Sequence, residues 1–164
     1  MTILHVCAWL ENSPVGLLVR ETLWGFPIVV AIHIVGLTMS AGLIAFFDLR
    51  LLGVWLTSCP VNVVYRRLLP FAIAGFAIML VSGGMLLAGY ATAAYGNVYF
   101  RIKIAALCVA ALNAWFYHRV TERSIASWNS DARPPLPARA AGLSSIVLWT
   151  AVILAGRMMS YTMF

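Results

Sequence analysis

His33 is the one ionisable residue in the apolar stretch from Phe26 to Phe47. An imidazole at membrane depth is energetically costly and usually marks a functional site. Gly36 and Ser40 follow at helical positions i+3 and i+7, so His33 shares its helix face with small residues. Such a face fits a close neighbouring helix or a flat ring. We therefore predict His33 as a ligand of haem iron, with copper binding, proton handling and a simple interhelical hydrogen bond as alternatives.

The second ligand of such an iron is less obvious. His118 lies about 20 Å farther along the helix rise than His33, which is too far for one iron. It remains a candidate ligand of a separate inner site, or an interfacial side chain that reaches lipid headgroups or Asp48. Met85 and Met158 fall at nearly the depth of His33, and a thioether is an acceptable ligand for haem iron or Cu(I). The alternative for both methionines is core packing.

Three basic residues lie at about the same depth as His33, namely Arg101, Lys103 and Arg157. An anionic ligand, such as haem propionates or a lipid headgroup, would offset their charge. The alternative is that Glu21 pairs with Arg157 or Arg20 while the other cations reach lipid phosphates. The sequence is compatible with both an anionic ligand and pairing within the chain.

The remaining reactive groups do not form a catalytic arrangement. Cys7, Cys59 and Cys108 fall at three different depths and cannot pair within one chain, and no CxxCH motif for covalent haem is present. The sequence contains no nucleophile–base pair, phosphate-binding loop, zinc-ligand spacing or paired carboxylates at one depth. We therefore predict no catalysis by this chain alone; at most it is a redox subunit.

The composition indicates the elements that position these residues. Of the 164 residues 63% are hydrophobic and 10% are charged, with a mean hydropathy of +0.93. A soluble domain needs more polar surface than this. Four apolar runs are long enough to cross a bilayer. The sequence thus predicts an all-α polytopic membrane protein, a single membrane domain over residues 1–164 with four transmembrane helices at about 23–47, 68–90, 98–118 and 141–163.

A short interfacial helix is predicted before the first span, with Ser13 as its N-cap and Pro14 at its first position. The start of the chain lacks the basic region and cleavage site of a removable signal peptide. Seven of the eleven basic residues fall in the two loops on one side: Arg50, Arg66, Arg67, Arg119, Arg123, Arg133 and Arg139. The positive-inside rule places these loops in the cytoplasm and both termini outside.

Small residues recur at helical spacing in the third predicted span, at Ala106, Ala110 and Ala114. Such faces let helices approach closely in lipid. They indicate a tight bundle, a homo-oligomer or docking onto other membrane subunits. The scattered arginines give no indication of nucleic-acid binding.

The segments ENSPVGLLVRETLWGFPIVVAIHIVGL, FFDLRLLG, RRLLPFAIAGF and LWTAVILAGRMMSY carry a resemblance to known proteins. They resemble a family of small bacterial four-helix inner-membrane proteins of unknown function. The marks of this resemblance are His33, Asp48-Leu49-Arg50, Asn113, His118 and Gly156-Arg157. The chain is more loosely similar to b-type membrane cytochromes and copper-resistance membrane proteins. The resemblance implies the bacterial inner membrane, with both termini periplasmic.

Two main functions follow as expectations. The first is a membrane subunit that binds haem b and takes part in electron transfer within a larger complex. The second is an accessory or assembly subunit without a cofactor, which contacts lipid and other membrane proteins. A metal or small-solute permease is a weaker alternative, because four helices leave little room for a pathway.

Overall fold

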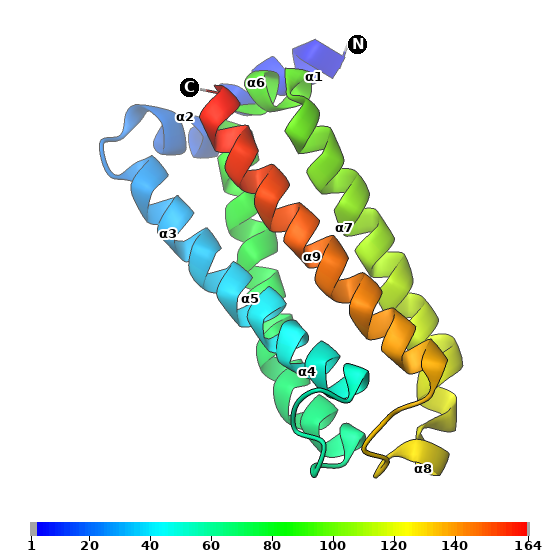
Figure 1. Ribbon diagram of the computed structural model, residues 1–164. Helices are drawn as coiled ribbons and strands as arrows, with labels where there is room; N and C mark the ends of the chain where they lie inside the picture. The colour runs from blue at the N-terminus through cyan, green and yellow to red at the C-terminus, as the bar shows by residue number, and fades with distance from the viewer. Residues whose placement is uncertain (1–2, 164) are drawn as a thin grey trace.

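The computed structural model describes residues 3–163, apart from the side chains of residues 120–122. The described residues are helical or in short connections, with no strand, as the sequence predicts. Four long helical segments run side by side as an elongated bundle (Figure 1). The first of these four segments consists of two α-helices joined by a π-helical turn. The segments are α3 (Gly25–Leu37) with η1 (Thr38–Gly42) and α4 (Leu43–Leu52), then α5 (Val61–Gly89), α7 (Val98–Phe116) and α9 (Leu136–Met163).

Short helices close the two ends of the bundle (Figure 1). At the end that holds both termini lie α1 (Ile3–Glu11), α2 (Pro14–Glu21) and α6 (Ala91–Gly96). At the other end lie η2 (Tyr117–Thr121), η3 (Glu122–Ser124) and α8 (Ile125–Trp128). The helix predicted after Ser13 is confirmed as α2, because the Ser13 Oγ accepts a hydrogen bond from the Gly16 N–H at 3.1 Å. Helices α1 and α6 were not expected from the sequence.

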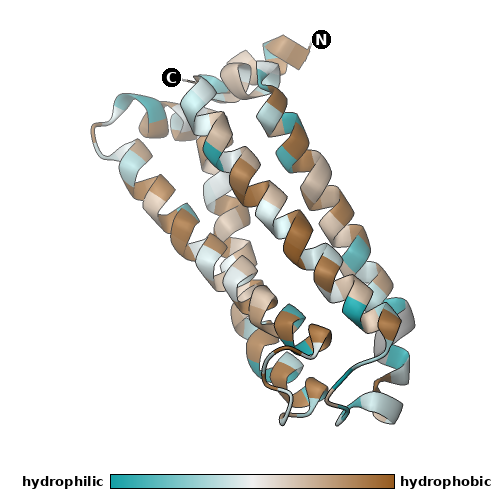
Figure 2. Ribbon diagram, viewed as in Figure 1, coloured by the Kyte–Doolittle hydropathy of each residue, from teal (hydrophilic) through white to brown (hydrophobic). Residues whose placement is uncertain are grey.

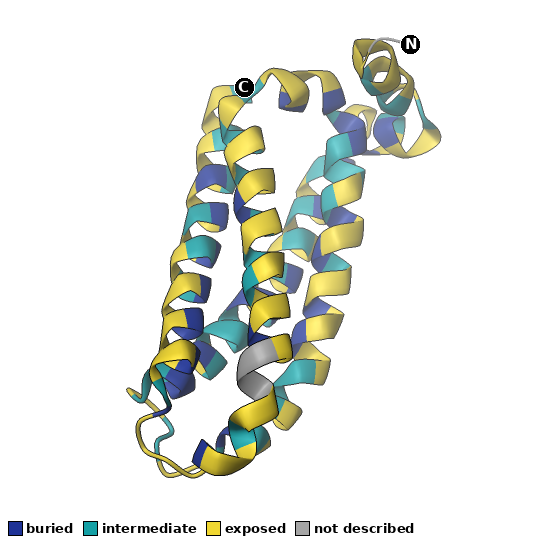
Figure 3. Ribbon diagram, turned by 90° about the vertical axis from the view of Figure 1, so that its right-hand side faces the viewer, coloured by how far each residue is buried: buried dark blue, intermediate teal, exposed yellow. Residues whose placement is uncertain are grey.

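Four helical segments of the described chain are long and apolar enough to cross a membrane, with mean hydropathies from 1.4 to 2.2. Their middle turns are hydrophobic, and polar residues gather toward the ends (Figure 2). The outward faces of the bundle are exposed (Figure 3) and carry large apolar side chains such as Leu80 and Leu112. An apolar exterior of this kind suits hydrocarbon rather than water.

The long helices extend beyond the apolar windows that predict them. Helix α5 begins at Val61, α9 begins at Leu136, and the first span ends at Leu52. Pro70 therefore lies inside α5, although it would fall in the first turn of a helix that began at residue 68. The difference arises because hydropathy marks only the part of a helix that lies in hydrocarbon, and the helix continues through polar residues at the interface.

The first two spans cross with their backbones in direct contact. A Cβ added at Gly36 would lie 2.7 Å from the Met79 nitrogen, and one at Gly75 would lie 2.7 Å from the Ser40 nitrogen. Only glycine allows two helices to approach this closely. The crossing holds α3 against α5 and leaves the lower part of the bundle, around α4, to be filled by larger side chains.

The loops at the α8 end are tied together by Arg50, which is completely buried. Its Nε donates to the Cys59 carbonyl at 2.8 Å, and a terminal nitrogen donates to the Asp131 carbonyl at 3.0 Å. Asn129 adds two more links, since its carbonyl accepts from the Val61 N–H and its side-chain oxygen from the Asn62 N–H, both at 2.9 Å. These bonds fix the ends of α4, α5 and α9 relative to one another.

Candidate functional site

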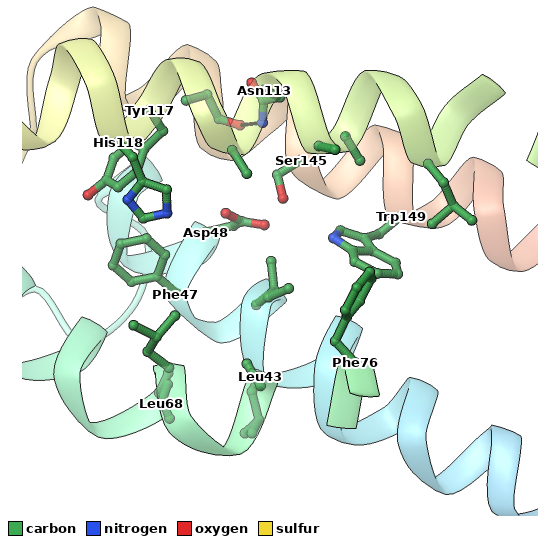
Figure 4. Close-up of a pocket in the computed structure, with 18 of the residues that line it drawn as sticks. Leu43, Phe47, Asp48, Leu68, Phe76, Asn113, Tyr117, His118, Ser145 and Trp149 are labelled. Carbon is green, nitrogen blue, oxygen red and sulfur yellow. Dashed lines mark hydrogen bonds between the residues drawn. The ribbon is translucent and has the colours of Figure 1, made fainter. Parts of the chain in front are cut away.

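A cavity of about 540 Å³ lies between α4, α5, α7 and α9. Its volume is within the range typical of small-molecule sites, roughly 300–1,000 Å³. Most of its lining is aliphatic or aromatic, including Leu43, Leu68, Phe76 and Trp149 (Figure 4). The cavity therefore offers an apolar compartment at the depth of the candidate membrane spans.

Polar side chains gather at one end of this cavity (Figure 4). Asp48 comes from α4, Asn113 from α7, Ser145 from α9, and Tyr117 and His118 from the π-helical turn η2. Turns of this type often occur at functional sites. The chain thus brings five polar residues from three separate spans to one place. We call this group the polar end of the cavity.

Asp48 is the central feature of the polar end. Its side chain is only 3% exposed, and Ser145 forms a hydrogen bond with it. The Oδ2 atom has no hydrogen-bond partner in the structure. A buried carboxyl oxygen without a partner is energetically costly. Oδ2 is therefore a buried acceptor with unused hydrogen-bonding capacity on a residue that lines the cavity.

The sequence analysis considered His118 as a ligand or as a partner of lipid or Asp48. In the structure its Nδ1 lies 3.5 Å from the Tyr65 hydroxyl oxygen, and its ring centroid lies 5.5 Å from that of Tyr117. Phe47 continues this aromatic group, with ring centroids 5.4 Å from Tyr65 and 5.7 Å from Tyr117. Aromatic rings thus line the cavity beside Asp48.

The cavity opens to the exterior between α5 and α7. Three of its lining residues are also strongly exposed, Phe76 at 41%, Leu80 at 64% and Ile104 at 43%. Ala110 and Ala114, two of the three alanines that recur at helical spacing in the third span, line this cavity. Their small side chains leave room beside α7, and the third alanine, Ala106, is buried against Trp149.

His33 lies outside this cavity, at the contact between α3 and α5. Its Nδ1 lies 3.0 Å from the Ser82 Oγ, and that hydroxyl donates to the Ile78 carbonyl at 2.6 Å. Because the Ser82 proton is used in this second bond, the first bond requires a proton on Nδ1 of His33. A neutral ring with its proton on Nδ1 has an unprotonated Nε2, which is the tautomer that a metal-binding histidine usually adopts.

The slot proposed beside His33 is filled by helix packing. Gly36 contacts the backbone of α5, and the ring of His33 itself covers Gly83, where an added Cβ would lie 3.0 Å from its Cε1. A haem at His33 would therefore need α3 and α5 to separate at this level. Met85 is half-buried, and Met158 is 43% exposed.

Two of the three basic residues predicted near His33 have hydrogen-bond partners within the chain. Arg101 donates to the Tyr95 carbonyl at 3.3 Å, and Arg157 donates to the Tyr161 hydroxyl at 2.9 Å. The side chain of Lys103 lies against Gly156 of α9. The pair Arg20–Glu21, one of the two predicted for Glu21, is present at 3.3 Å. No group of three or more His, Cys, Asp or Glu side chains suited to a metal ion occurs within the described part of the chain.

Asp48 and Arg50, an acidic and a basic neighbour on α4, form no ion pair with each other in the described part of the chain. The ion pairs found among the described residues all involve Arg20. Positions i and i+2 of a helix point to different sides, so Asp48 and Arg50 cannot share partners easily. The signal that could have identified Asp48 is an acidic residue that directly follows 26 residues, 22–47, without Asp, Glu, Lys or Arg.

The fold and the cavity together define a class: a helical bundle with four helices suited to a membrane and an apolar cavity with one polar end. The chain belongs to a family of unknown function, DUF6644, whose model matches residues 7–162. No match was found among curated proteins or among solved structures.

Proposed function

We propose that this protein is an integral membrane protein that binds a small lipophilic molecule in the cavity between α4, α5, α7 and α9. The observation that carries the proposal is Asp48, a buried residue with a partnerless Oδ2 at the polar end of a mostly apolar cavity. A site with an apolar body and few polar groups at one end selects an amphiphilic ligand.

The ligand reaches the cavity from the bilayer. The exposed residues at the opening, Phe76, Leu80 and Ile104, lie within candidate spans, so the opening faces hydrocarbon once these spans cross the membrane. We further propose the orientation that the basic loops favour, with the polar end toward the cytoplasm and both termini outside, in the inner membrane of a bacterium. The chain then acts as a ligand-binding subunit beside other membrane proteins.

Haem binding at His33 is the second candidate, and the tautomer described above supports it. The free Nε2 would supply one axial ligand, and haem would supply redox chemistry. The geometry favours the cavity as the primary site, because the space around His33 is taken up by α3 and α5. Electron transfer, a cofactor-free accessory role and transport remain predictions from the sequence.

Trp149 provides a direct test of the cavity, since its indole lies in the lining and is 8% exposed. Bromine quenches nearby tryptophan fluorescence. Protein in lipid nanodiscs is titrated with 8-bromooctanol, and the quenching seen in Trp149→Phe is subtracted to remove the other tryptophans. We expect a saturable component from Trp149.

Two phenylalanine variants on α7 control this experiment. Ala110→Phe places a ring in the cavity and should abolish the saturable quenching. Ala105→Phe makes the same change at an exposed position outside the lining and should preserve it. Quenching that does not saturate, or that is equal in Trp149→Phe and the wild type, would rule out binding in this cavity.

A further inference from the structure

We propose that the ligand of this cavity is a lipophilic organic cation, a protonatable amine, whose head lies between Asp48 and the aromatic group of Phe47, Tyr65 and Tyr117. This inference rests on the proposed function, because it names the class of molecule that the cavity takes. The charged and aromatic side chains at the polar end of the cavity are the features that favour a cation.

The charges of the lining favour a cation. Asp48 is the one acidic residue among the described lining residues, and neither lysine nor arginine is among them. The nearest strong cation along the chain, Arg50, is directed to the Cys59 and Asp131 carbonyls. A carboxylate at this depth is costly without a partner, and a bound cation would supply one. A carboxylate ligand would instead be repelled by Asp48.

The aromatic group provides the second half of the site. Phe47, Tyr65 and Tyr117 are linked by centroid distances of 5.4 and 5.7 Å and all line the cavity. Asp48 lies beside Phe47 and His118 in the same region (Figure 4). Aromatic faces attract ammonium groups, and the attraction increases when water is excluded. A carboxyl group next to aromatic rings is thus suited to an ammonium head.

An amine satisfies Asp48 in either of its protonation states. If the carboxyl group is ionised, an ammonium N–H donates to the carboxylate. If it is protonated, a neutral amine accepts that proton, and the same ammonium–carboxylate pair forms. The hydrocarbon tail then extends past Leu43 and Phe76 toward Trp149 and the opening between α5 and α7. An alcohol can only donate a weaker, uncharged hydrogen bond.

Three probes of equal chain length test the class of ligand: 8-bromooctylamine, which is protonated to an ammonium ion in water, 8-bromooctanol and 8-bromooctanoate. Each is titrated into the protein in nanodiscs of zwitterionic lipid, with quenching of Trp149 as the readout and empty nanodiscs as the correction for partitioning. We expect the ammonium probe to bind at least about tenfold more tightly than the alcohol, as expected for a charge-assisted contact. The octanoate should bind least.

Asp48→Asn removes the charge with little change in shape. It should weaken binding of the ammonium probe about tenfold and leave the alcohol unchanged, whereas Asp131→Asn, the same change at an exposed loop residue outside the lining, should alter neither. Thermal unfolding of each variant checks that it is folded. Equal affinities for the three probes, or unaltered ammonium binding in Asp48→Asn, would overturn the cation proposal while the alcohol titration still supports the cavity. Failure of every probe to quench Trp149 would overturn both proposals.

Discussion

Asp48 and Arg50 lie two residues apart on α4, yet their side chains contact different parts of the molecule. Asp48 faces the cavity, where Ser145 of α9 contacts it, and Arg50 binds the carbonyls of Cys59 and Asp131 in two loops. Both side chains are buried, and one atom of each lacks a partner, Oδ2 and one terminal nitrogen. We infer that the two residues of α4 have different roles. Arg50 stabilises the end of the bundle, and Asp48 belongs to the ligand-binding cavity.

Arg50→Ala should destabilise the protein by about 3 kcal/mol, because two buried charge-assisted hydrogen bonds are lost. Unfolding by a denaturing detergent, followed by helical circular dichroism, measures the change. Arg67→Ala is the control, since Arg67 is exposed on α5 and its loss should cost less than about 0.5 kcal/mol. Equal stability of the two variants would contradict the structural role of Arg50.

Gly36→Ala should be strongly destabilising, because its Cβ would lie 2.7 Å from the Met79 nitrogen and 2.9 Å from the Gly75 oxygen. These are backbone atoms, so α3 and α5 must move apart. Gly84→Ala on α5 is the matched control, because nothing lies within 4 Å of its added Cβ. There alanine should stabilise the helix by roughly 0.5–1 kcal/mol. The same detergent-unfolding assay compares the two, and a tolerated Gly36→Ala would argue against the close crossing.

The topology predicted from the basic loops can be checked with Cys59, which is exposed in the loop between α4 and α5. In a variant that retains only this cysteine, a membrane-impermeant maleimide should label it after permeabilisation but not in intact cells. Labelling from outside in intact cells would reverse the orientation and place the polar end of the cavity at the outer surface.

Haem binding at His33 remains a prediction with a spectroscopic test. Protein produced with an adequate haem supply should show a Soret band that is lost in His33→Ala and kept in His5→Ala, because His5 lies on α1, outside the spans. Ser82→Ala should change the band as well, because it removes the acceptor of the Nδ1 proton. A folded wild-type protein without a Soret band would exclude haem and leave the cavity as the site.

Local sequence patterns predicted the helices well. Hydropathy depends on the residues of one segment alone, so the four candidate spans can be read from composition. The start of α2 follows from Ser13 and Pro14, whose capping bond spans only three residues. Pairing of Arg20 with Glu21 is likewise local. Helices α1 and α6 gave no comparable signal, since each is short.

Only the tertiary structure showed which side of each helix faces its neighbours. A helix that is apolar all round has no polar stripe to indicate which side faces its neighbours. The contact of His33 with Ser82 joins residues 49 positions apart, and that of Asp48 with Ser145 joins two different spans. The sequence alone determined that a histidine at membrane depth would need a partner or a ligand, because polarity in hydrocarbon is costly. Packing of α4, α5, α7 and α9 determined that Asp48 faces a cavity and His33 a neighbouring helix.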